Sequence, residues 1–126
     1  MVFVFGNPLV AADSIALNVA AVLKDKMENV QFEFIESIAD LENLPRHLLV
    51  LDTVENADKI SVIEDLDQLK SEQPVSGHDF DFAMEAKMML KLGKIDSIAI
   101  IAVPADYELG KAVRHVELLI RRFISS

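Results

Sequence analysis

The chain has 126 residues, a length that predicts one domain, residues 1–126, with a hydrophobic core of useful size. Its hydrophobic content of 52% argues against disorder, and its net charge of -9 argues against binding to nucleic acid or to a membrane. The absence of cysteine excludes disulfides, thiol nucleophiles and thiolate metal ligands. We expect a cytoplasmic protein, because no apolar run resembles a signal peptide or reaches the roughly 18 residues of a membrane span.

The first elements are a strand and a helix. Residues 1–5 (MVFVF) form a continuous apolar run, which is typical of a buried strand. Residues 14–27 carry apolar side chains at helical spacing and predict a helix. Asp13 or Ser14 can cap this helix, because a short side chain with an oxygen can accept hydrogen bonds from the amides of the first turn.

The middle of the chain predicts three further strands. Residues 30–35 alternate between apolar and polar side chains, whereas residues 47–52 (HLLVLD) are apolar on both faces and indicate a central strand. Residues 59–64 predict a weaker strand at an edge of the sheet. A short helical turn is expected over residues 39–45, and residues 65–79 read as a polar loop with proline and glycine.

The last third of the chain predicts a helix, a strand and a second helix. Apolar side chains nearly surround a helix over residues 80–92, and Gly93 stands where a helix often ends. Residues 97–104 (SIAIIAVP) predict a buried strand, and residues 107–124 predict an amphipathic helix. This order of elements predicts an α/β fold, a three-layer α/β/α sandwich with a mostly parallel, roughly five-stranded sheet.

Three polar residues are candidates for a functional site at one edge of this sheet. Ligands in such folds collect at the carboxyl ends of the strands. Asp13 follows the first strand, Asp52 ends the third, and His78 lies between the fourth strand and the next helix. Two carboxylates and one imidazole suit Zn²⁺ or Ni²⁺, and they leave positions open for water or a substrate atom.

Each candidate also has a structural explanation. Asp13 can be a helix cap, Asp52 can form a turn, and His78 can cap a helix together with Asp79. Other motifs are missing: the sequence contains no GxGxxG, no Walker A sequence, no GxSxG and no HExxH. The residues alone therefore leave both a metal site and a purely structural role open.

Three segments of the chain, in this order, resemble those of hydrogenase maturation endopeptidases, which trim the C-terminus of [NiFe]-hydrogenase large subunits. The first is VFVFGNPLVAADSIALNVAAVL, a strand, a Gly-Asn-Pro segment and an acid that opens a helix. The second is LLVLDTVENAD, an apolar strand that ends in Asp. The third is SGHDFDFAMEAKMMLKLG, with Ser-x-His at a helix start, and a hydrophobic strand follows it.

The resemblance implies a phosphorylase/hydrolase-like fold and an endopeptidase, aspartyl-type or metal-dependent, that acts in protein processing. It implies that Asp13, Asp52 and His78 bind the metal and form the catalytic site. The metal is nickel that the substrate can supply, and zinc or cadmium can substitute for it in vitro. The implied partner is the hydrogenase large-subunit precursor. Water would be activated by a metal or by a carboxylate, because the chain has no cysteine.

Two departures from the family pattern suggest alternatives. Ala12 stands where the family has the first of two paired acids, and residues 35–40 (IESIAD) replace a glycine-rich turn associated with substrate handling. A non-catalytic relative of the same fold that binds metal or protein is therefore the second hypothesis. A third is an unrelated α/β enzyme or binding domain in which Asp13 is only a cap.

Overall fold

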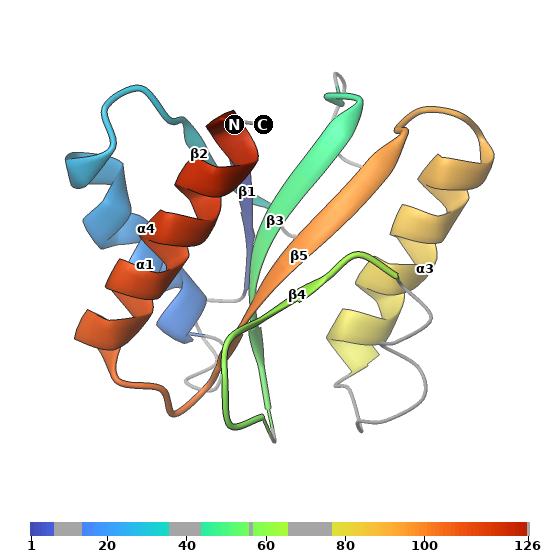
Figure 1. Cartoon of the computed structure of the whole chain (residues 1–126). Coiled ribbons are helices and arrows are strands. Elements are labelled where there is room, and N and C mark those ends of the chain that lie inside the picture. The colour runs from blue at the N-terminus through green and yellow to red at the C-terminus, as the bar shows by residue number, and fades with distance from the viewer. Residues whose placement is uncertain (7–13, 36–43, 56, 66–76, 126) are drawn as a thin grey trace.

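The protein is an α/β/α sandwich in which a five-stranded sheet lies between two layers of helices (Figure 1). This computed structural model describes residues 1–6, 14–35, 44–55, 57–65 and 77–125, with side chains left out at 14, 77–83 and 125. The elements are β1 (Val2–Phe5), α1 (Ser14–Lys26), β2 (Phe32–Ile35), β3 (His47–Val54), β4 (Ser61–Ile63), α3 (Gly77–Lys91), β5 (Ser97–Pro104) and α4 (Leu109–Ser125). The predicted fold class is therefore confirmed.

The strand order is β2-β1-β3-β5-β4, so β3 is central, as its apolar sequence predicts. β1, β2, β3 and β5 are parallel, and β4 pairs with β5 in the antiparallel direction. The weaker strand β4 is at an edge, also as predicted. Their parallel direction brings the carboxyl ends of β1, β3 and β5 to one edge of the sheet, which we call the carboxyl edge; the opposite one is the amino edge.

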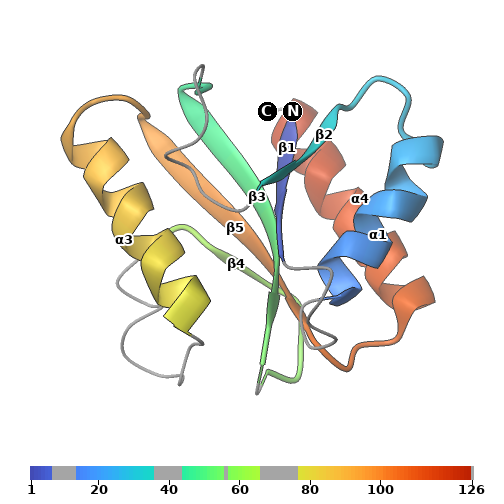
Figure 2. The same cartoon turned by 180° about the vertical axis from the view of Figure 1, so that it is seen from behind.

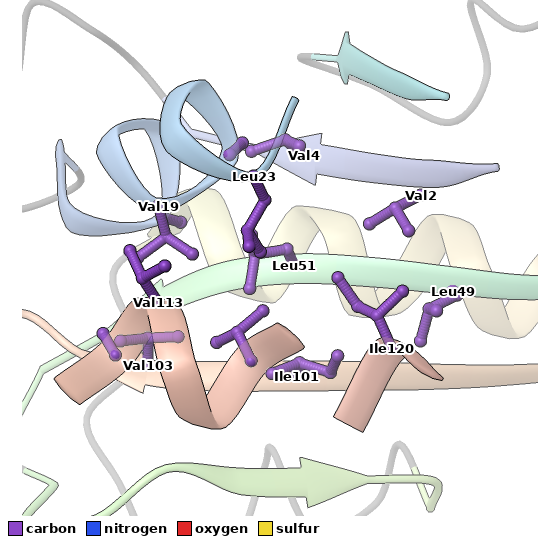
Figure 3. Close-up of a cluster of buried hydrophobic side chains, with 14 of the residues drawn as sticks. Val2, Val4, Val19, Leu23, Leu49, Leu51, Ile101, Val103, Val113 and Ile120 are labelled. Carbon is purple, nitrogen blue, oxygen red and sulfur yellow. The ribbon is translucent and has the colours of Figure 1, made fainter. Parts of the chain in front are cut away.

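Helices α1 and α4 cover one face of the sheet (Figures 1 and 2). Their apolar sides meet alternate side chains of the strands, because successive residues of a strand point to opposite faces. Figure 3 shows this cluster, in which Leu51 of the central strand lies beside Leu23 of α1. Val19, Leu51 and Ile101 are fully buried in it. This contact of two helices with the sheet forms the larger hydrophobic core.

Of the helices that the structure describes, α3 is the one on the other face (Figure 2). The alternate side chains of the strands, among them Phe3, Val50 and Ile100, form a second buried cluster there. Ala86 of α3 is buried in this cluster. The two faces of the sheet therefore carry two separate hydrophobic cores, one packed against α1 and α4 and the other against α3.

Helix α3 ends as the sequence predicts and begins earlier than predicted. Gly93 has a φ of 73°, its N–H donates to the Leu90 carbonyl, and the Lys94 N–H donates to the Met89 carbonyl. This hydrogen-bond pattern requires a left-handed residue, which glycine adopts without strain. The helix begins at Gly77, although the predicted loop ran to residue 79. The residues of the first turn are mostly polar, so a hydropathy pattern does not reveal them as helical. Acidic residues in a first turn stabilise a helix through its dipole.

Other predicted elements differ from the structure by one or two residues at a boundary. The central strand continues to Val54 rather than ending at Asp52, because Thr53 and Val54 pair with Val103 and Pro104 of β5. The last helix begins at Leu109, two residues after its predicted start. Most of the predicted helical turn over residues 39–45 lies outside the described residues.

Candidate functional site

The carboxyl edge collects strand ends and helix starts from distant parts of the chain. β1, β3 and β5 all end there, and α1 and α3 both begin there, as Figure 1 shows. The C-terminal end of α3 lies at the amino edge. There the guanidinium of Arg46, the residue before β3, donates a hydrogen bond to the Gly93 carbonyl at 3.0 Å. Helix α3 therefore runs from the carboxyl edge to the amino edge, antiparallel to β3.

Asp52 is a carboxylate built into the central strand close to this edge. Its side chain is buried, with 7% of the residue exposed. Because strand residues alternate, Asp52 shares the face of Leu48 and Val50, which is the face that α3 covers. Its partner in β5 is Ala102, a residue with a small side chain. A buried carboxylate is costly unless it accepts hydrogen bonds or binds a cation, so this position is a strong candidate for a function.

One oxygen of Asp52 has a structural task. The Thr53 N–H donates to the Asp52 Oδ1 atom at 2.8 Å. The Val54 carbonyl accepts from the Ala105 N–H on the β5 side, so the Thr53 N–H points the other way, toward β1. The pairing of β1 with β3 ends one residue before Asp52, at Leu51. Asp52 thus accepts a hydrogen bond from a backbone N–H that lies just beyond the end of the pairing between β3 and β1.

Thr53 is a residue that the sequence reasoning missed. Its side chain lies on the α1 face, where its Oγ1 atom accepts a hydrogen bond from the Ala16 N–H at 3.0 Å. The Ala16 amide is one of the first-turn donors for which Asp13 or Ser14 were the expected acceptors. The dipeptide Asp52-Thr53 therefore connects both faces of the sheet, with the carboxylate toward α3 and the hydroxyl toward the start of α1. A polar pair at the end of an apolar strand was the only signal in the sequence.

We expect Thr53→Val to destabilise the protein by about 1–2 kcal/mol, because the buried Ala16 N–H loses its acceptor while the volume of the side chain is kept. Thr53→Ser is the matched control, since it keeps the hydroxyl and loses only a methyl group. Urea unfolding followed by circular dichroism measures both. A Thr53→Val protein that is as stable as Thr53→Ser would contradict a capping role.

The side chains of the other two predicted site residues lie outside the described part of the structure. His78 is the second residue of α3, so its backbone lies at the helix end nearest the carboxyl edge, above the face that carries Asp52. Its side chain is outside the described atoms. Asp13 is outside the described residues, directly before α1, which begins at Ser14. The structure therefore describes the Asp52 carboxylate and the backbone of His78, and the three-residue metal site stays a prediction.

The donor set would suit a divalent transition metal. Carboxylate oxygens and an imidazole nitrogen are ligands for nickel and zinc, and a buried carboxylate such as Asp52 gains most from a cation. Among the residues whose side chains the structure describes, no group of three His, Cys, Asp or Glu residues could hold a metal ion. That set does not contain Asp13 or the side chain of His78.

The remaining two histidines do not join the predicted site. His47 is the first residue of β3, at the amino edge, and its Nδ1 atom lies 2.7 Å from the Ser97 Oγ atom. His115 is an exposed residue of α4, on the opposite layer from α3. His78 is thus the histidine that the chain order brings to the carboxyl edge.

The parallel sheet, the antiparallel edge strand and helices on both faces place the chain among three-layer α/β/α proteins. Within this class it is similar to the [NiFe] hydrogenase maturation protease HybD from Thermococcus kodakarensis, with a TM-score of 0.66, 17% identity, and coverage of 94% of this chain and 97% of that one. It is also similar to the hydrogenase maturating endopeptidase HybD from E. coli, with a TM-score of 0.64, 14% identity, and coverage of 96% and 92%.

A third similar structure is an uncharacterized protein from Wolinella succinogenes, with a TM-score of 0.58, 14% identity, and coverage of 97% of this chain and 96% of that one. No protein-family model and no curated protein match the chain. The resemblance predicted from the three sequence segments is therefore confirmed in the fold, over nearly the whole length. No described helix is long and apolar enough to cross a membrane.

Proposed function

We propose that this protein is an endopeptidase that removes the C-terminal extension of a [NiFe]-hydrogenase large-subunit precursor after nickel insertion. Asp13, Asp52 and His78 recognise the nickel, which is part of the substrate, and they form the catalytic site. The fold of the two HybD proteins supports a role in hydrogenase maturation. The nickel ligands and the identity of the substrate are our inference from the residues at the carboxyl edge.

The observation that carries the proposal is the buried carboxylate of Asp52. It lies in the central strand, beside the small Ala102, on the face that α3 covers. Burial excludes water from the carboxylate and strengthens its attraction to a cation. A protein that used Asp52 only to accept the Thr53 N–H could use an uncharged asparagine at much lower cost in desolvation. A cation bound beside this carboxylate would be favoured by its burial, and nickel in the precursor is such a cation.

The chemistry of the cleavage follows from the side chains that the chain offers. The sequence has neither a cysteine nor a GxSxG motif for a serine nucleophile, so we take water to be the nucleophile. Nickel, when the precursor supplies it, contributes a Lewis acid. The carboxylates and the imidazole would bind it and orient the precursor, so that the C-terminal extension is held beside the carboxyl edge. A carboxylate at this edge can also accept a proton from water.

The test of the proposal is trimming of a purified large-subunit precursor from the same organism. We expect wild type to shorten the nickel-loaded precursor and to leave the nickel-free precursor intact. His78→Ala should lower the trimming rate on the order of 100-fold or more, the range typical for loss of one catalytic group. His115→Ala is the matched control, because this exposed histidine lies on α4, in the helix layer on the opposite face of the sheet from α3.

Zinc titration of the isolated protein gives a second readout that does not need activity. Wild type should bind Zn²⁺ more tightly than His78→Ala by about 10–100-fold, while His115→Ala should bind like wild type. Equal and weak binding by all three proteins would rule out the metal site. A wild-type protein that binds the nickel-loaded precursor without trimming it would replace the proposal by the alternative, a non-catalytic metal- or protein-binding relative.

A further inference from the structure

Helix α3 carries apolar side chains on two opposite sides. Toward the sheet, Ala86 is buried and Met89 and Leu90 are partly buried against the second core. On the other side, Met84, Met88 and Leu92 are 44%, 58% and 61% exposed. These three residues are spaced by four, so they form a continuous row along the helix, and we call this row the outer stripe.

An apolar outer side is unusual for a helix at the surface of a protein. Such helices bury one side and present charged residues on the other, and a helix that is apolar all around is normally covered on both sides. Helix α4 is closer to the ordinary case: arginines and a lysine are exposed on its outer side, and its exposed apolar residues, Leu109, Leu118 and Ile124, are not spaced by four. The outer stripe of α3 is therefore a candidate surface for a protein partner.

The charges beside the outer stripe restrict the partner. Lys87 and Lys91 precede Met88 and Leu92 by one residue each, and they lie along the same side of the stripe. From residue 84 to residue 94 the chain has three lysines and one glutamate, a net charge of +2 in a protein with a net charge of -9. A partner with apolar residues beside carboxylates is complementary to this surface.

The same charges disfavour an antiparallel contact with a second copy of this chain. In a two-fold contact between two antiparallel α3 helices, each side of the stripe faces the same side of the other helix. Lys87 and Lys91 would then oppose the same lysines of the copy. Like charges facing each other weaken such a contact, so the stripe fits an acidic partner better than it fits an antiparallel copy of itself.

We propose that the outer stripe, with Lys87 and Lys91, docks the hydrogenase large-subunit precursor through a surface patch of apolar residues beside carboxylates; this inference rests on the proposed function. At about 1.5 Å per residue, Met84 is about 9 Å along the helix from His78 and Leu92 about 21 Å. A precursor docked along α3 would therefore lie beside the carboxyl edge, and its extension could enter the site there. The stripe would add affinity without touching the cleaved bond.

The experiment measures binding and trimming of the nickel-loaded precursor by Met88→Glu, Lys91→Glu and wild type. Leu118→Glu is the matched control, since it places the same charge on an exposed apolar position, 65% exposed, of the opposite layer. We expect Met88→Glu and Lys91→Glu to raise Kd and KM at least 10-fold with kcat unchanged. Leu118→Glu should behave like wild type. All positions are exposed, and thermal unfolding should confirm that each variant folds.

Each outcome separates the docking surface from the proposed function. Trimming by wild type with unchanged Kd and KM in Met88→Glu and Lys91→Glu would overturn the docking surface and leave the peptidase assignment intact. No binding and no trimming by wild type would overturn the proposed function and this partner together. A wild type that forms dimers, with Met88→Glu a monomer in sedimentation, would show that a second copy covers the stripe and would also overturn the proposal.

Discussion

Asp52→Asn is expected to lower trimming of the nickel-loaded precursor on the order of 100-fold or more and to leave the protein folded. Asparagine keeps an oxygen that can accept the Thr53 N–H, at present 2.8 Å from the Asp52 Oδ1 atom. It loses the negative charge that binds a cation, so the affinity for Zn²⁺ should fall as well. The measurements are the trimming rate, zinc titration and the midpoint of urea unfolding.

Asp52→Ala distinguishes the two tasks of this residue. It removes both the charge and the hydrogen-bond acceptor, and it leaves the Thr53 N–H without its present partner. We expect a loss of stability of about 1–3 kcal/mol for this variant beyond that of Asp52→Asn, together with the loss of trimming. If Asp52→Asn trims as well as wild type, the carboxylate serves only the backbone and takes no part in the proposed metal site.

Leu51→Ala is expected to destabilise the protein by about 2–5 kcal/mol, which is a large part of the stability of a typical domain. Leu51 belongs to the central strand, and its side chain is fully buried in the larger core, beside Leu23 of α1 (Figure 3). Truncation would remove apolar contacts and leave a cavity that the helices of the larger core cannot close fully. Urea unfolding followed by circular dichroism gives the free energy of unfolding.

Leu118→Ala is the control for Leu51→Ala, because it makes the same chemical change at an exposed position of α4. Its effect should stay within about 0.5 kcal/mol. Similar losses in the two variants would mean that the burial of the central strand does not dominate stability. Neither variant changes a predicted ligand, so Leu118→Ala should trim the precursor like wild type.

The order of the elements and the central position of β3 could be predicted from the sequence, because they depend on local patterns. Continuous apolar runs mark strands buried on both faces, and helical spacing marks α1 and α4. The end of α3 was also predictable, since a glycine with a φ of 73° has a clear local signature. The choice of Asp52 as a candidate came from the same patterns, through the rule that ligands gather at the carboxyl ends of strands.

Tertiary contacts decided what local patterns cannot contain. The strand runs past Asp52 because β5 pairs with Thr53 and Val54, and the Thr53 hydroxyl accepts the Ala16 N–H from a helix 37 residues away in the sequence. The apolar sides of α3 look alike in the sequence, and only the position of the sheet makes the outer stripe the exposed one. The sequence by itself determined which elements form and in which order, since propensity and periodicity are local. Which polar groups meet, and which apolar side stays uncovered, depended on packing between distant segments.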